Sequence, residues 1–459
     1  MRQRNAIIKW LTPGLGIKRW LLLLLLGITL LAIGFAQVIV SIYRTTDLPT
    51  LLSALTLRFL PMWVRLVLSA LLGLGAIVTA LYELNRSILA PFASPRRDSW
   101  LNLAYARSRR QRGLKVVAIG GGTGLPSVLR GLKAYTSHIT AIVTVADDGG
   151  SSGKLRRELG ILPPGDLRNN IAALANDEDL MAQLFQYRFA DGGLEGHSFG
   201  NLFLSAMTAL TGSMDQAVAE TGRVLAIEGR VLPATLHNVT LVAEVQIAGE
   251  SRRRRVVGES QIPEAGGQIE HVFLQPDYAR AYPDAIRAIL DADLVVIGPG
   301  SLFTSLLPTL LVNGIVEALR VSRAYIVYVC NVATQQGETD NFTVADHIVA
   351  LEQHIGRNSF DAVVANNHYP SKNKGENTHY VRPASGHDPV NGEILQRYHI
   401  EWTDLTDEER PWRHDPAKLA QALLKVYEAV VHTPALPAQN DAVGVTEPVN
   451  PVDANPSQQ

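Results

Sequence analysis

Apolar runs that stop at glycines or small polar residues recur through the middle of the chain. The first run, residues 115–119, is rich in β-branched residues, breaks into glycines and resumes at residue 125 with apolar positions at helical spacing. Residues 292–305 repeat this order. β-branched apolar runs predict strands, and apolar residues every three or four positions predict helices. Each segment therefore predicts a strand, a tight loop and the start of a helix.

The loop after the first run has the residues of an anion site. Gly121, Gly122, Thr123 and Gly124 let the backbone approach a ligand, and the first amides of the following helix point at the same place. The loop lacks the third glycine of the Rossmann fingerprint, where Leu125 stands, and it lacks the Gly-Lys-Ser/Thr of a Walker loop. A plain tight turn is the alternative interpretation.

Two adjacent carboxylates end the next apolar run. Asp147 and Asp148 follow residues 141–146 and precede a loop of small residues that includes Ser151. Ligands of open α/β sheets bind at the carboxyl ends of the strands, and neighbouring strand side chains face opposite ways. One acid should therefore face the crevice, as a hydroxyl acceptor or an Mg²⁺ ligand, while the other supports it. Solvated acids in an Asp-Gly turn are the alternative.

Further segments carry polar residues at the ends of strands or the starts of helices. Residues 163–170 and 196–205 place polar side chains directly before apolar helical runs, where Asp166 and Ser198 would alternatively serve only as N-caps. Residues 324–334 form an apolar strand that ends on Asn331. Together these segments predict one shared site at one edge of one sheet.

The motifs together resemble those of the CofD/YvcK family, the group labelled gluconeogenesis factors. The resemblance covers residues 113–432 and implies an α/β fold with a doubly wound, Rossmann-like, mostly parallel sheet. One lineage of the family transfers a phospholactyl group in deazaflavin coenzyme synthesis. The other affects cell shape and wall synthesis on gluconeogenic carbon sources and is associated with nucleotide-sugar binding; this chain resembles it more closely. The motifs are Gly121-Gly-Thr-Gly124, Asp147-Asp148-Gly-Gly-Ser151, Pro-Gly-Asp166-Leu-Arg168, Phe199-Gly-Asn201 and Gly298-Pro-Gly-Ser301, with Pro308 in the next helix.

Two hypotheses about function use the same ligand cradle. In the first, the protein binds a nucleotide or nucleotide sugar and regulates cell shape, cell-wall synthesis and central carbon metabolism through protein partners. In the second, it is a transferase of the 2-phospho-L-lactate type with a nucleotide-activated donor, in which Asp147 or Asp148 holds Mg²⁺ or the attacking hydroxyl and Arg168 neutralises charge. We favour the first, because the sequence shows no partner that would make His197 or His237 a general base. The residues expected to bind the ligand are Gly121, Gly122, Thr123, Gly124, Ser151, Asp166, Asn169, Asn201, Gly298, Gly300, Ser301 and Asn331.

Composition and charge exclude some classes of ligand and site. A net charge of −1 gives no general attraction to nucleic acid. The basic run 252–255 lies between two strand-like segments, as the exposed part of a hairpin would. The lone Cys330 excludes an intrachain disulfide, and no Cys/His spacing indicates a zinc site. We expect a homo-oligomer that binds no nucleic acid.

The N-terminal region has a different pattern. Residues 21–43 carry no charged side chain, and about 20 residues suffice to cross a bilayer. Residues 59–82 form a second span interrupted by Arg65, which can reach the interface from near the helix end. A hydrophobic hairpin packed on a soluble domain is the alternative.

The chain is therefore expected to have three parts. Residues 1–112 form a two-helix transmembrane hairpin with a basic linker, and residues 113–432 form the nucleotide-binding α/β domain, which the apolar pattern of 416–431 closes with a helix. Residues 433–459 show neither helical nor alternating periodicity and should be disordered.

We predict that both ends of the hairpin face the cytoplasm, which places the protein in the inner, cytoplasmic membrane with its α/β domain inside. Lysine and arginine residues precede the first span and follow the second, whereas the loop near Pro49 holds chiefly Arg44 and Arg58. Such residues mark the cytoplasmic side of membrane spans. A reporter that works only in the cytoplasm should be active when fused after Tyr82. Activity only of an external reporter would instead indicate a single span.

Overall fold

The computed structural model describes residues 110–111, 113–175, 180–249, 252–371, 379–384 and 389–431, with isolated positions between 28 and 64. The expected membrane spans at 21–43 and 59–82 therefore lie outside the described residues apart from isolated positions, and the tail from 433 lies outside them entirely. No helix within the described ranges is long and apolar enough to cross a membrane. The chain divides into two compact units, residues 1–114 with 133–138, and residues 115–132 with 139–459.

Only a small part of the first unit lies within the described residues. In it, the Thr136 hydroxyl donates a hydrogen bond to the Leu114 carbonyl at 2.8 Å. All elements discussed below belong to the second unit.

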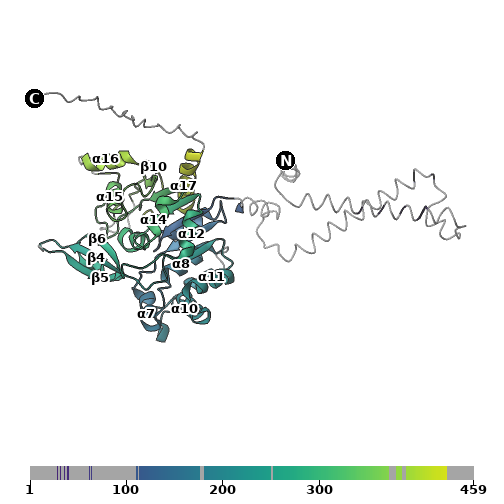
Figure 1. The fold of residues 1–459 in the computed structure, drawn as a ribbon, viewed down its shortest axis with the longest axis horizontal. Helices are drawn as coiled ribbons and strands as arrows, with labels where there is room; N and C mark the ends of the chain where they lie inside the picture. Colours follow the sequence, from purple (N-terminus) through teal and green to yellow (C-terminus); the bar gives the residue numbers. More distant parts are fainter. Residues whose placement is uncertain are drawn as a thin grey trace, which may run out of the picture. The chain divides into compact units, whose positions relative to one another are not determined.

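A seven-stranded sheet forms the centre of the second unit (Figure 1), and every pairing in it is parallel. Its order is β10-β9-β8-β7-β1-β2-β3. The inner strands are fully buried runs of Val, Ile and Ala, as parallel strands covered on both faces require. The expected α/β fold with a mostly parallel sheet is confirmed. The strands are β1 Val116–Gly120, β2 Ile139–Val143, β3 Arg230–Pro233, β7 Leu294–Ile297, β8 Tyr325–Val329, β9 Ala362–Asn366 and β10 His399–Thr403.

The helices pack in two groups. In one, α17 contacts α6, α6 contacts α8 and α8 contacts α11; in the other, α12 contacts α14, and α13 contacts α14 and α15. Connections between parallel strands are right-handed. The strand after β1 lies on one side of it in the sheet, and the strand after β7 lies on the other side. The helices that follow β1 and β7 therefore cover opposite faces of the sheet. The helices are α6 Leu125–Leu132, α7 Gly150–Leu159, α8 Gly165–Leu174, α9 Leu180–Gln186, α10 Phe199–Thr211, α11 Met214–Val224, α12 Pro283–Leu290, α13 Leu307–Leu310, α14 Ile315–Val321, α15 Val344–Ile355, α16 Pro389–Arg397 and α17 Pro416–Val431.

The expected closing helix is α17. It buries Leu419, Leu423 and Val426, and it crosses α6 where that helix has Gly131. A Cβ added to Gly131 would lie 2.1 Å from the Pro416 carbonyl oxygen. Only glycine therefore lets the two helices approach this closely.

A second, antiparallel sheet has the order β5-β4-β6, formed by β4 Thr240–Gln246, β5 Arg254–Val257 and β6 Gln268–Gln275. The basic run at 252–255 lies at the exposed start of β5, in the hairpin that the sequence predicts. Arg253 pairs with Glu270, and Arg255 lies 5.1 Å from the centroid of the Phe273 ring. The 3-10 turns η3 Glu259–Gln261 and η4 Pro263–Ala265 lead from β5 to β6.

We predict that a protein comprising residues 113–432 folds without the preceding segment. The buried core of the two sheets and their helices lies in the second unit, so the hydrophobic free energy of folding comes from within it. Circular dichroism should show a single cooperative thermal transition. A broad transition without near-ultraviolet signal would show that residues 1–112 are needed for folding.

Candidate functional site

The candidate site lies where the order of the main sheet reverses. The chain runs from β1 outward to β2 and β3, and later returns to β7 on the other side of β1. The loops that follow β1 and β7 therefore border a crevice at the carboxyl ends of the strands, the usual position of ligands in open α/β sheets. The predicted glycine segments at 121–124 and 298–301 are these two loops.

The glycines let the two loops touch each other. A Cβ at Gly124 would lie 2.5 Å from the Pro299 carbonyl oxygen, and a Cβ at Gly121 would lie 2.5 Å from Asp166 Oδ2. Gly122 has φ +63°, a conformation that disfavours other residues. The sequence predicts that these glycines make room for a ligand. In the structure a Cβ at Gly121 or Gly124 would meet other parts of the protein, and Gly124 also lines the cavity described next.

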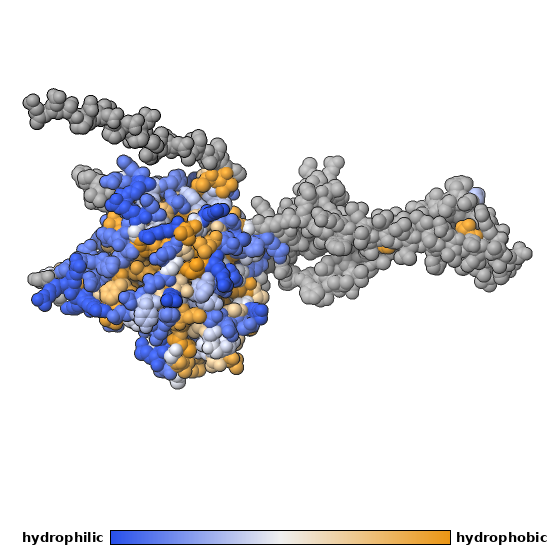
Figure 2. All heavy atoms as spheres, in the orientation of Figure 1, coloured by the Kyte–Doolittle hydropathy of each residue, from blue (hydrophilic) through white to orange (hydrophobic). Residues whose placement is uncertain are grey.

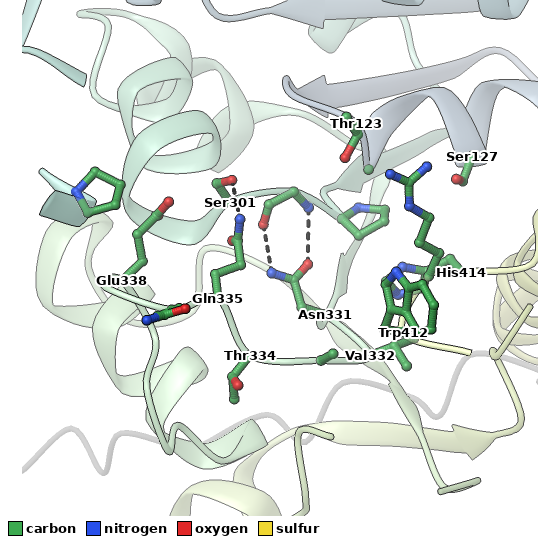
Figure 3. Close-up of a pocket in the computed structure, with 17 residues that line it drawn as sticks. Thr123, Ser127, Ser301, Asn331, Val332, Thr334, Gln335, Glu338, Trp412 and His414 are labelled. Carbon is green, nitrogen blue, oxygen red and sulfur yellow. Dashed lines mark hydrogen bonds between the residues drawn. The ribbon is translucent and has the colours of Figure 1, made fainter. Parts of the chain in front are cut away.

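A cavity of about 600 Å³ opens beside the two loops, and we call it the switch-point cavity. Figure 3 shows Thr123 and Ser127 on one side of it, Asn331 in the middle, and Glu338 at the opposite end from Trp412. The cavity is mostly polar in its lining groups. Its wall comes from five places in the chain: residues within 123–127, Pro263, and residues within 299–301, 331–338 and 412–414.

Hydrogen bonds fix the shape of this cavity. Asn331 Oδ1 accepts from the Gly300 amide at 3.2 Å, and Asn331 Nδ2 donates to the Gly300 carbonyl at 2.9 Å. Gln335 Nε2 donates to the Ser301 hydroxyl at 2.7 Å. His414 is buried with its Nε2 3.1 Å from the Cys330 carbonyl, and burial lowers its pKa to about 4. A neutral His414 thus anchors the segment that carries Trp412.

Carboxylates from three segments gather beside the glycine loop, and we call Asp147, Asp148, Asp166 and Glu259 the carboxylate cluster. Asp166 Oδ2 accepts from the Gly122 amide at 2.8 Å. Asp147 Oδ1 accepts from the Gly149 amide at 2.9 Å. Asp148 Oδ1 accepts from the Ser260 amide, also at 2.9 Å, and so ties the cluster to the loop after β5.

Ionisation of the cluster is unfavourable, although Arg156 and Arg168 lie close enough to favour the charged forms of Asp147 and Asp166. Burial, reinforced by neighbouring carboxylates, raises the pKa of Asp166 to about 6 and that of Glu259 to about 8. The pKa of Asp147 is raised mainly by burial as well. Desolvated acids close to one another resist ionisation together. A bound cation or ligand donor would relieve this cost.

The two adjacent aspartates point in different directions. Asp147 faces α7 and α8, since a Cβ added to Gly165 would lie 3.1 Å from its Oδ2, while Asp148 faces Gly258 and Ser260. The two side chains thus face different parts of the protein, and neither is among the wall residues of the switch-point cavity. Asp166 does not cap α8, whose N-cap is Pro164, whereas Ser198 does cap α10 by accepting from the Asn201 amide.

A third group of expected site residues lies between α7, α8 and α10. Ser151 Oγ lies 3.0 Å from His197 Nδ1 and accepts from Asn201 Nδ2 at 3.0 Å. Arg168 donates to Ser198 Oγ and, at 2.8 Å, to Asn169 Oδ1. Burial lowers the pKa of Arg168, and the nearby Arg188 charge lowers it further. Arg168 is thus committed to neighbouring side chains, with the Asp166 charge close by.

The expected residues therefore fall into three adjoining groups. Sequence reasoning missed Glu259, Glu338, Gln335 and Arg413, which stand outside any motif. His237 lies apart, edge-on to Tyr278 at 6.3 Å between ring centroids. The first group lines the switch-point cavity and consists of Thr123, Gly124, Gly300, Ser301 and Asn331, with Gly298 behind them. The second group is the carboxylate cluster with its neighbouring glycines: Gly121, Gly122, Asp147, Asp148 and Asp166. The third group lies between the helices and consists of Ser151, Arg168, Asn169 and Asn201.

The cluster suits a cation only together with a ligand. In the described part of the chain, no three His, Cys, Asp or Glu residues are grouped so that they could hold a metal ion. Mg²⁺ is usually bound by one or two carboxylates, with water and phosphate oxygens as its other ligands. Asp147 and Asp166, whose pKa values burial raises, have the chemistry for that mode.

The fold and the site define a class of protein. A sequence model of the family described as 2-phospho-L-lactate transferase CofD matches residues 116–430, and the chain belongs to this family. The resemblance to the CofD/YvcK family is thereby confirmed.

Relatives place the chain near the gluconeogenesis factors. A Nostoc protein (strain PCC 7120) is 45% identical over 442 residues, covering 93% of this chain and 94% of the relative. The gluconeogenesis factor of Bacillus subtilis is 53% identical over 253 residues, covering 55% of this chain and 78% of the relative. A crystal structure of a Bacillus halodurans protein superposes with a TM-score of 0.63 at 44% identity, covering 68% of this chain and 99% of that one.

We predict that Asp166→Asn stabilises the domain at high pH but not at low pH. A carboxyl whose pKa is higher in the folded than in the unfolded state adds stability below its ordinary pKa, and this stability is lost as the pH rises through the folded pKa. With the pKa of Asp166 raised from 3.8 to about 6, the loss falls between about pH 4 and pH 6. Asparagine does not ionise, so the variant keeps its stability over this pH range.

Urea unfolding of both proteins at pH 4 and pH 8 tests this. The variant should gain on the order of 2 kcal/mol relative to the wild type between the two pH values. A difference in unfolding free energy that does not change with pH would contradict the assigned environment of Asp166.

Proposed function

We propose that this protein is a membrane-anchored regulator whose cytoplasmic domain binds a nucleotide or nucleotide sugar in the switch-point cavity. The observation that carries the proposal is the coincidence of backbone N–H donors, a free guanidinium and an aromatic ring in one cavity at the reversal of the sheet order. Crevices of this kind hold nucleotides in many α/β proteins.

The phosphates would lie at the N-terminus of α6. The first turn of a helix has amides without helical partners and carries the positive end of the helix dipole. Thr123, Gly124 and Ser127 line the cavity there, opposite Ser301. Arg413 lines the cavity, is exposed, and forms no ion pair within the described residues. Its guanidinium is therefore free to pair with phosphate oxygens.

The base would lie at the end of the cavity formed by Trp412. Trp412 lines the cavity, two residues before the buried His414, which contacts the Cys330 carbonyl. Aromatic rings stack on bases of any kind, so this contact favours a nucleoside without selecting its base.

A transferase is the second candidate function, and the carboxylate cluster favours it. The Gly122 amide links Asp166 to the loop that borders the cavity. Mg²⁺ held there by Asp147 or Asp166 would polarise a phosphate and stabilise charge that develops during group transfer. This chain's own contribution would be the cradle that orients the donor and the carboxylates that accept a hydroxyl proton. The family's name as a phospholactyl transferase is in line with this candidate.

The regulatory part of the proposal follows from relatives named as gluconeogenesis factors. We infer that ligand occupancy alters how the domain meets protein partners in cell-wall synthesis and carbon metabolism. The Nostoc similarity covers 93% of the chain and so extends beyond residues 113–432, which supports a shared role for the N-terminal region. Leu159, Leu184 and Leu210 are exposed on α7, α9 and α10. Figure 2 shows hydrophobic surface at the lower end of the domain, where Figure 1 labels α7 and α10; such a surface would suit self-association.

We predict that the protein binds uridine or guanosine nucleotides and that Arg413→Gln weakens binding. Loss of a charge-assisted hydrogen bond to phosphate should raise the Kd about tenfold or more. Isothermal titration calorimetry measures this directly. Arg357→Gln, which removes another exposed arginine outside the cavity, is the matched control and should leave the Kd unchanged.

Turnover assays separate the two candidate functions. Binding without turnover of nucleotide-activated donors in the presence of Mg²⁺ would support the regulator, and turnover that is lost in Asp147→Asn would support the transferase. If no uridine or guanosine nucleotide bound, the ligand class would be wrong.

A further inference from the structure

A second cavity, of about 760 Å³, adjoins the switch-point cavity. The two cavities share Pro263, Gln336 and Glu338 as wall residues. The rest of the second wall comes from residues 266–268 at the start of β6, from residues within 337–342, from Asp346 in the first turn of α15, and from His379. We call it the side cavity. A ligand longer than the switch-point cavity can therefore extend past Glu338 into the side cavity.

The two cavities differ in charge. The switch-point cavity has Arg413 and the start of α6 in its wall. The side cavity adds Asp340 and Asp346 to the shared Glu338, and His379 is its other ionisable wall residue; neither lysine nor arginine is among its described wall residues. Phosphate would be repelled there by like charge. The side cavity thus suits an uncharged group attached to an anionic one.

Amide side chains supply most of the free polar groups of the side cavity. Gln268, Gln336 and Asn341 are exposed, and their side chains make no hydrogen bond with the part of the chain that the structure describes. A carboxamide both donates and accepts, and so does a hydroxyl. Phe342 adds an apolar surface to the same wall. The hydroxyl groups and the C–H face of a sugar ring match these amide groups and the phenyl ring.

Glu338 sits at the junction with one oxygen unused. The residue is only 8% exposed. Its Oε1 accepts from the Thr304 hydroxyl at 3.0 Å, whereas its Oε2 is buried without a hydrogen-bond partner among the described residues. An unsatisfied buried acceptor costs free energy. Burial also raises the pKa of Glu338 to about 7, against the hydrogen bonds of Thr304 and Phe303 that lower it. A donor from a ligand would satisfy Oε2.

We propose that the side cavity binds the uncharged, hydroxyl-rich part of a ligand whose phosphates lie in the switch-point cavity, and that Glu338 accepts a hydrogen bond from a ligand hydroxyl at the junction. This inference rests on the proposed function and deepens it. It assigns the distinction between a nucleotide and a nucleotide sugar to Glu338 and to the amide side chains beyond it.

Calorimetry with matched ligands tests the assignment. The probes are UDP and UDP-glucose, with GDP and GDP-mannose as a second pair. Gln268→Ala and Glu338→Gln should each weaken binding of the sugar nucleotide about tenfold, and should change binding of the corresponding diphosphate less than about twofold. Gln268 is exposed at the start of β6, so its truncation leaves the core intact even if the Glu338 variant folds poorly. Gln353→Ala, an exposed glutamine on α15 outside both cavities, is the control.

The possible outcomes separate the inference from the function on which it rests. A selective loss of sugar-nucleotide affinity in Gln268→Ala supports the assignment. If the wild-type protein binds both ligands and Gln268→Ala weakens neither, or weakens both equally, nucleotide binding stands and the assignment of the side cavity is overturned. If the wild-type protein binds no member of either pair, the proposed function fails, and this inference fails with it.

Discussion

The contact between the loop after β1 and the loop after β7 is the constraint on which the site depends. These loops leave neighbouring parallel strands whose next strands lie in opposite directions, so the crevice between them exists only if the backbones meet. Gly124 meets Pro299 at a distance that excludes any side chain. Asn331, at the end of β8, then clamps Gly300 through both of its amide atoms. The cavity walls are thereby held before any ligand arrives, which lowers the free-energy cost of binding.

Electrostatics divides the site into two ends. Asp147, Asp166 and Glu259 are drawn together by packing and have no lysine or arginine directly hydrogen bonded to their carboxyl oxygens in the described structure. Arg168 lies close enough to lower the pKa of Asp166, but its hydrogen bonds within the described residues go to Ser198 and Asn169. Arg413, in the wall of the switch-point cavity, forms no ion pair within the described residues. In this part of the chain, neither the carboxylates nor Arg413 is paired with an opposite charge by a direct hydrogen bond. A ligand that carries phosphate, with or without Mg²⁺, would supply the missing partners.

Local patterns were enough to predict part of this arrangement. The strand, loop and helix around residues 115–132 and the equivalent segment after residue 292 form β1 with α6 and β7 with its following loop, because β-branched runs and helical periodicity are local properties. The hairpin around the arginine run was also predictable, although the three-stranded sheet to which it belongs was not. The family resemblance supplied the parallel sheet. Patterns could not show that Gly121 and Gly124 face protein, since close approach between distant segments has no local signal.

The site residues that the sequence did not predict were missed for the same physical reason. Glu259, Glu338 and Arg413 lie in irregular segments, where an isolated charged residue resembles any surface charge. Only the tertiary structure buries Glu338 and brings Glu259 beside Asp147. Asp166 and Ser198 looked alike as helix caps, yet only Ser198 caps a helix, because Gly122 needs an acceptor and the side chain of Asp166 reaches it.

A crystal structure of the domain with a bound nucleotide sugar tests the central claim most directly. We expect the phosphates against the start of α6 and Ser301, the base beside Trp412, and a guanidinium contact from Arg413. Phosphates bound anywhere other than the crevice between the loops after β1 and β7 would contradict it.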